Sequence, residues 1–301
     1  MNTSASYLKL PKDVLKERIE EAFSILDECK LCPRKCGVNR NKNERGYCKA
    51  GFLPVVSSYG PHFGEESVLV GKYGSGTIFF TGCNLGCIYC QNYEISQLME
   101  GREVSFEELA RMMIYLQHIG CHNINFVTPT HQVPQILKAL EIAIELGLKV
   151  PLVYNTGGYD CVETLKLLEG IFDIYMPDIK YSDNSFAQKY SNAKDYFDVV
   201  KQAVKEMHRQ VGDLAIDQNH IAYRGLLVRH LVLPNNIAGS YEVFKFLLEE
   251  ISPNTFINIM AQYRPCFKAH NFTELSRRIY REEFLEAVRL AVEMGFRRII
   301  S

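Results

Sequence analysis

The 301-residue chain has almost no net charge and no apolar run close to the ~20 residues that a membrane-spanning helix needs. Its 34 basic and 35 acidic residues give a formal charge of −1, which indicates no basic surface for nucleic acid or anionic lipid. The start, Met1 to Ser4, lacks the basic-then-apolar pattern of a secretion signal. We therefore expect a cytoplasmic protein with neither a nucleic-acid nor a membrane partner.

Cysteine, by contrast, is plentiful: the chain has ten, and seven of them fall in two clusters, as metal ligands do in a reducing compartment. The first cluster, Cys83, Cys87 and Cys90, has the spacing C-x3-C-x2-C and follows the strand-like stretch 77–81. Three thiolates leave a metal position free, whereas a structural zinc or a closed iron–sulfur cluster normally takes four protein ligands. The sequence therefore predicts a metal centre with one coordination position left free for a substrate or cofactor. A zinc loop or three unrelated core cysteines are the alternatives.

The second cluster has the spacing C-x2-C-x3-C-x11-C and comprises Cys29, Cys32, Cys36 and Cys48. Four thiols form a complete ligand set, which predicts a structural metal or an auxiliary cluster. Zinc and a second [4Fe-4S] cluster both remain open, because thiolates accept both metals. The alternative is reduced thiols on a flexible extension. Three isolated cysteines are interpreted as packing residues, although the last follows a predicted strand end and could face the site: Cys121, Cys161 and Cys266.

Strand-like and helix-like segments alternate from Thr77 onward, which predicts parallel β/α units. The predicted strands are 77–81, 123–127, 150–154, 172–176, 226–233 and 255–260. The predicted helices are 105–120, 133–146, 162–168, 186–211, 241–251 and 273–293. Six units are too few for a closed eight-stranded barrel, so we expect an α/β fold with a partial (β/α)6 TIM-type barrel over 71–301. Residues 1–70 are predicted to form an N-terminal extension with a helix at 12–28, the four-cysteine metal site, and short strands and turns from residue 51.

Polar residues follow the predicted strands, where β/α barrels carry their chemistry. The candidates for cofactor or substrate contacts are Tyr89, Asn92, Thr128, Thr130, His131, Asn155, Asp178, Lys180 and Arg229. Each also has an ordinary interpretation as a turn residue, a helix cap or an exposed ion pair. Because all six strand ends face the side that carries the thiolates, we expect these side chains to converge on one site.

The first cysteine cluster, with aromatic Tyr89 before its last cysteine, resembles the signature of the radical S-adenosylmethionine (SAM) superfamily. The resemblance implies that three cysteines hold a [4Fe-4S] cluster whose fourth iron is chelated by the amino and carboxylate groups of SAM. More of the chain is similar to the family labelled pyruvate formate-lyase activating proteins. The matching stretches are 29–36, 46–48, 62–66, 74–77, 83–92, 123–131, 154–155, 173–181, 229–234 and 260–263.

Comparison with true glycyl radical enzyme activases reveals both likeness and departure. The stretch 178–180 is similar to their D-L-K strand end, but Thr128-Pro129-Thr130-His131 stands where they have G-G-E-P. Backbone carbonyls at that strand end are then expected to hold the SAM amino group. The four-cysteine cluster also lies before the radical motif, whereas activases with extra clusters carry them after it.

The resemblance implies reductive cleavage of SAM, with a low-potential flavodoxin- or ferredoxin-type electron donor. Asn155, Asp178 and Lys180 are expected to contact SAM or substrate, and Arg229 to meet the SAM carboxylate or a substrate anion. The substrate is either a small molecule or a polypeptide, and the activase hypothesis is the polypeptide case. The alternative from a different functional class is a protein without catalytic activity, which would carry electrons or serve as a scaffold for a cluster.

Overall fold

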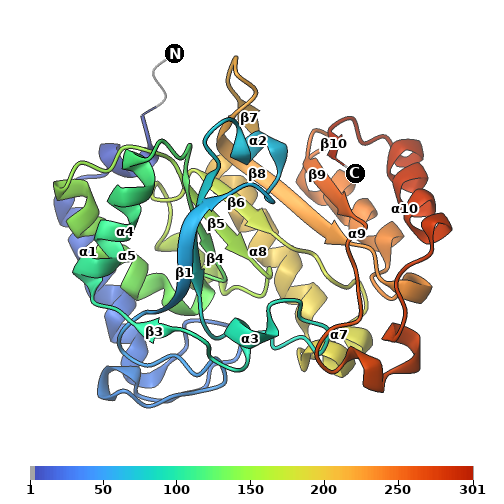
Figure 1. Ribbon diagram of the computed structural model, residues 1–301, viewed down its shortest axis with the longest axis horizontal. Helices are drawn as coiled ribbons and strands as arrows, with labels where there is room; N and C mark the ends of the chain where they lie inside the picture. Colours follow the sequence, from blue (N-terminus) through green and yellow to red (C-terminus); the bar gives the residue numbers. More distant parts are fainter. Residues whose placement is uncertain (1–3, 301) are drawn as a thin grey trace.

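The computed structural model describes residues 4–300; residues 1–3, part of the start that lacks a signal pattern, lie outside it (Figure 1). The main sheet has the strand order β10-β9-β8-β6-β5-β4-β2-β1-β3. The strands from β2 to β10 in this order are parallel, whereas β1 is antiparallel to both β2 and β3. The sheet is open, since β3 and β10 stand at its two ends.

The strands are β1 Val55–His62, β2 Ser75–Phe80, β3 Arg102–Glu103, β4 Ile124–Val127, β5 Leu152–Thr156, β6 Ile174–Pro177, β7 Ala215–Ile216, β8 Ala222–Leu231, β9 Phe256–Met260 and β10 Ile299–Ile300. The α-helices are α1 Lys12–Ser24, α2 Ser67–Val70, α3 Tyr93–Ser96, α4 Phe106–His118, α5 Val133–Glu145, α6 Val162–Lys166, α7 Asn184–Ser191, α8 Tyr196–Val211, α9 Ser240–Phe246 and α10 Arg281–Met294. None of the helices within residues 4–300 is long and apolar enough to span a bilayer.

The predicted partial α/β barrel is confirmed, because β2, β4, β5, β6, β8 and β9 are the six predicted parallel strands. The predicted single helix 186–211 is wrong, since α7 ends at Ser191, its C-cap Asn192 has a left-handed φ of 50°, and α8 begins at Tyr196. The predicted helix 273–293 is also too long: residues 273–275 form a 3-10 turn and α10 begins at Arg281. Strand β1 is one continuous strand in the region predicted as short strands and turns from residue 51, because Gly60 and Pro61 obscure its pattern.

The two faces of the sheet bury different cores. Phe126 and Tyr154 belong to the large core that also contains residues of helices α4, α5 and α8. The inner face carries a smaller apolar plug that includes Val153, Ile174, Met176 and Leu227. Helix α2 closes this plug, and the side-chain amide of Asn123 donates to the carbonyl of Leu69 at 3.0 Å. The carboxyl ends of the strands stay free of the plug, which leaves room for a site.

The cysteine-rich extension packs against the barrel near α3 (Figure 1). Its helix α1 packs on α5, and the 3-10 turn Ile25–Glu28 leads into Cys29. Strand β1 lies before residue 70 but is hydrogen bonded to β2 along most of its length. The boundary between an extension and a barrel at residue 70 stays a prediction.

Candidate active site

A cavity of about 250 Å³ lies at the carboxyl ends of the parallel strands. Its volume is close to the lower end of the range for small-molecule sites. The sequence-predicted residues that line it are Cys83, Cys87, Tyr89, Cys90, Asn92, Thr128, Asn155, Asp178, Lys180 and Arg229. The expected convergence of strand ends on the three thiols is therefore present in the structure.

The three thiols sit on a loop that the rest of the chain holds from several sides. The backbone N–H of Ile88 donates to Tyr190 at 2.9 Å, and its carbonyl accepts from Lys268 at 2.9 Å. Gly86 adopts a φ of 68°, which a residue with a side chain adopts only with strain. The loop thus depends on segments more than 100 residues away for its shape.

Each sulfur has a hydrogen-bond partner of its own. Cys83 Sγ accepts from the N–H of Leu85 at 3.3 Å, Cys87 Sγ accepts from the hydroxyl of Ser191 at 3.0 Å, and Cys90 Sγ lies 3.3 Å from the hydroxyl of Ser96. Such donors suit sulfur that carries negative charge.

Burial keeps the thiol of Cys87 neutral unless a metal binds. Burial raises the pKa of Cys87 to about 12, although the nearby Lys180 ammonium opposes this shift. A metal ion deprotonates a coordinating thiol outright. One buried and two partly buried thiols, each with a hydrogen-bond partner, and a fourth side open to the cavity fit a [4Fe-4S] cluster with one exchangeable position.

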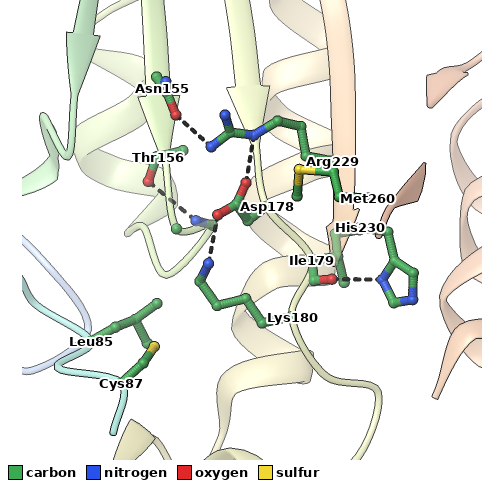
Figure 2. Close-up of polar contacts among 12 residues, drawn as sticks. Leu85, Cys87, Asn155, Thr156, Asp178, Ile179, Lys180, Arg229, His230 and Met260 are labelled. Carbon is green, nitrogen blue, oxygen red and sulfur yellow. Dashed lines mark hydrogen bonds and ion pairs between the residues drawn. The ribbon is translucent and has the colours of Figure 1, made fainter. Parts of the chain in front are cut away.

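A buried charge network crosses the strand ends beside the thiols (Figure 2). Asp178 accepts from Arg229 Nε at 2.7 Å and from Lys180 Nζ at 2.5 Å. Arg229 Nη2 also donates to the side-chain carbonyl of Asn155 at 2.7 Å. Burial alone would raise the pKa of Asp178, but Arg229 and Lys180 together hold it below its usual value. Asp178 is therefore charged, and its two cations have fixed positions.

Sequence reasoning missed two further members of this network, Glu65 and Glu66. Their carboxylates lie 3.7 and 3.9 Å from Arg229 Nη1. Burial raises the pKa of Glu65, and Arg229 opposes that shift. They lie in a turn between β1 and α2, distant in sequence from any parallel strand end, and although the stretch 62–66 resembles the family, no role followed for either carboxylate. Three carboxylates already surround Arg229, so its predicted role as a receptor for a free carboxylate loses support.

Thr128 reaches the cavity in a strained backbone conformation. Its φ is 58°, which is unusual for a β-branched residue, and its N–H donates to the carbonyl of Asn155 at 2.9 Å. Tyr89 packs edge-on against Tyr181 and Tyr263, and its buried hydroxyl has no partner within the described residues. Strain and an unpaired hydroxyl are features that functional sites retain.

Two predicted residues do not line this cavity, although they follow a strand as predicted. Thr130 donates to Asp160 Oδ1 at 2.7 Å in a buried polar group that also contains Thr156. His131 Nε2 lies 2.8 Å from the carbonyl of Thr81, and burial lowers its pKa to about 4. The 3-10 turn Thr130–Gln132 directs both side chains away from the cavity. Their predicted contact with the cofactor of this cavity is not supported.

The four N-terminal thiols line a second, smaller cavity, and His131 lies in its wall. Arg34 joins this region to the first thiol loop: its guanidinium donates to the carbonyls of Asn84 at 2.7 Å and Leu85 at 3.2 Å. Among residues 4–300, no three histidine, cysteine or carboxylate side chains are grouped closely enough to hold a single metal ion.

Known proteins resemble this chain in sequence and in structure. A model of the radical SAM superfamily matches residues 77–216, which include all three thiols of the first cavity. An uncharacterized protein of Methanocaldococcus jannaschii is 33% identical over 291 residues, which cover 93% of this chain and 78% of that protein. Methylornithine synthase has a TM-score of 0.48 and 14% identity, over 96% of this chain and 75% of its own.

A second solved structure, native anSMEcpe with bound AdoMet, has a TM-score of 0.47 and 15% identity, over 73% of this chain and 61% of its own. The superfamily match includes most residues that line the first cavity, although Arg229, Leu231, Met260 and Gln262 lie beyond it, and the archaeal relative spans nearly all of the chain. This chain belongs to the radical SAM superfamily of enzymes.

Proposed function

We propose that this protein cleaves SAM reductively at a [4Fe-4S] cluster held by Cys83, Cys87 and Cys90. The observation that supports this most is the cavity itself, with three hydrogen-bonded thiols on one wall and a charged network on the other. When bound, the reduced cluster supplies one electron to the sulfonium of SAM, which yields methionine and a 5′-deoxyadenosyl radical that takes hydrogen from a substrate.

The residues of the chain bind and orient the reactants. Lys180, held by Asp178, offsets the negative charge of the thiolates beside Cys87. Asn155 and the backbone at Thr128 present polar groups to the same space. Arg229 acts through Asp178, which it neutralises and fixes. Positioning of the target C–H bond and exclusion of water are the main contributions of such a site.

The reductant is proposed to be a low-potential flavodoxin or ferredoxin, because the cluster works at the low end of the iron–sulfur range. The substrate is a small molecule or a polypeptide. An activase that acts on a glycyl radical enzyme is the polypeptide case, which the open sheet leaves room for. We further propose that the four N-terminal thiols hold zinc or a second cluster.

The test is anaerobic reconstitution followed by dithionite and SAM, with 5′-deoxyadenosine as the measured product. Wild-type protein is expected to form it, and Cys87→Ala protein is expected to form none. Cys121→Ala serves as the matched control, since Cys121 is buried but lines neither thiol cavity. Failure of fully loaded wild-type protein both to bind SAM in a titration and to form product would favour the scaffold alternative.

A further inference from the structure

The second cavity is built by a short, tightly turned segment. The N–H of Cys29 donates to Val38 at 2.9 Å, and the carbonyl of Cys29 accepts from Gly37 at 3.1 Å. The carbonyl of Cys32 accepts from Lys35 at 3.0 Å. These bonds fold the first three thiols of the set around one space, and Cys48 closes it from the end of the segment.

A buried cation stands in the wall of this cavity without a counter-ion. Arg40 is only 1% exposed and lines the cavity with the four thiols. Its Nε and Nη2 both donate to the carbonyl of Gly51, at 3.1 and 3.0 Å, but its Nη1 has no acceptor. No carboxylate among residues 4–300 forms an ion pair with it. A buried guanidinium of this kind is costly unless an anion with a free acceptor atom lies beside it.

His131 supplies a second unpartnered atom in the same wall. The ring is 1% exposed, and its Nε2 faces the carbonyl of Thr81, so this nitrogen carries the proton. Its Nδ1 has no partner in the described residues. In this tautomer Nδ1 is an acceptor, which a sulfide or thiolate cannot satisfy, so the argument for an anionic acceptor inside the four-thiol cavity rests on the free N–H of Arg40.

We infer that the cavity of Cys29, Cys32, Cys36 and Cys48 holds a second [4Fe-4S] cluster rather than zinc, with Arg40 as its buried counter-cation. The inference rests on the proposed function in one respect, namely that the protein is loaded with iron–sulfur clusters. A cluster bound by four thiolates is anionic and carries inorganic sulfides, and these offer acceptor atoms to the N–H of Arg40. A zinc ion brings no acceptor atom of its own, so Arg40 would depend on the thiolates alone.

The segment that builds the second cavity also contacts the loop that carries the first three thiols. The carbonyl of Cys48 lies so close to Gly82 that a Cβ there would come within 2.3 Å of it. Gly82 directly precedes Cys83, and the hydroxyl of Tyr47 donates to the carbonyl of Leu85 at 2.9 Å. The segment ordered by the second cluster therefore forms part of the wall of the first thiol loop.

The experiment removes the cysteines of the first site, so that any metal still bound must occupy the second site. Protein with Cys83, Cys87 and Cys90 all replaced by Ala is purified without oxygen, and iron, sulfide and zinc are measured per chain. We expect about four irons and four sulfides to remain, with no zinc. Adding Cys32→Ala should remove them. Adding Cys161→Ala should not, because Cys161 is a buried neighbour of the set that does not line the cavity.

Arg40→Met in the same background is expected to shift the reduction potential of the remaining cluster to more negative values, because a buried positive charge favours the more negative reduced state. Arg40→Lys should retain most of the wild-type potential. Circular dichroism confirms that each variant is folded. One zinc per chain and no iron in the triple variant, or no metal at all, would overturn the inference. Iron in the triple variant without product from wild-type protein would instead count against the proposed function alone.

Discussion

Among single substitutions, Asp178→Asn has the most clearly expected effect: it should lower the free energy of unfolding. Asparagine keeps the shape of the side chain but removes the charge that holds Arg229 at 2.7 Å and Lys180 at 2.5 Å. The side chain of Asp178 is 14% exposed, and those of the two cations are each 17% exposed, so water replaces the lost charge poorly. Removal of one partner from a buried ion pair typically costs 3–5 kcal/mol, and this partial exposure favours about 3 kcal/mol.

This loss converts into a measurable melting shift. An unfolding entropy of about 2.1 cal/mol/K per residue amounts to roughly 0.6 kcal/mol/K for a chain of this length, so Tm should fall by about 5 °C. Glu103→Gln is the matched control, since its pair with Arg45 spans 3.0 Å with side chains 44% and 48% exposed. Exposed pairs contribute about 0–1 kcal/mol, so the control Tm should barely change.

Both variants are melted anaerobically at pH 7 and at one scan rate. Because Arg229 and Lys180 hold the pKa of Asp178 below its usual value despite burial, its contribution should be complete above about pH 4 and lost only below that. Equal Tm shifts for Asp178→Asn and Glu103→Gln would refute the claim that this network is effectively buried.

Three further predictions concern single residues. Thr128→Gly should be at least about 1 kcal/mol more stable than Thr128→Ala, because only glycine adopts a φ of 58° freely; equal denaturation midpoints would contradict the strain. Burial lowers the pKa of His230 to about 4, so the unfolded chain binds the extra proton between pH 6.5 and 4 and stability falls by up to ~1.4 kcal/mol per pH unit as pH drops. In His230→Gln protein, melting from pH 7.5 to 5 should show a shallower slope, and an unchanged slope would exclude this role. Arg34→Lys should lose iron from the first cluster several-fold faster to a chelator than wild type, because the carbonyls of Asn84 and Leu85 lose their fixed donors; equal rates would show that these bonds do not hold the loop.

The barrel was predictable because its strands repeat one chemical pattern. Short β-branched and aromatic stretches separated by amphipathic helices leave little alternative to a parallel sheet. The break between α7 and α8 was not predictable in the same way, since Asn192 interrupts a continuous amphipathic stripe with a left-handed residue. Strand β1 escaped full recognition because Gly60 and Pro61 are rare inside strands, and its partner β2 decides its conformation.

The sequence predicted which residues follow the strands at the candidate site, but it did not predict which way their side chains point. Asn155 and Asp178 line the cavity as expected. Thr130 and His131 follow a strand in the same manner, yet a local 3-10 turn rotates them elsewhere. Arg40 carried no sequence signal, and the family-like stretch that contains Glu66 indicated no role for it, because the importance of both comes from burial beside groups distant in the chain.

The supports of the first thiol loop have a consequence for how the protein is made. All seven clustered cysteines have been synthesised by residue 90, long before Tyr190, Ser191 and Lys268 exist to hold that loop. A nascent chain therefore carries exposed thiols without the shell that positions them and keeps water away. Insertion of the first cluster should follow completion of the barrel, and delivery during translation would meet a disordered ligand set.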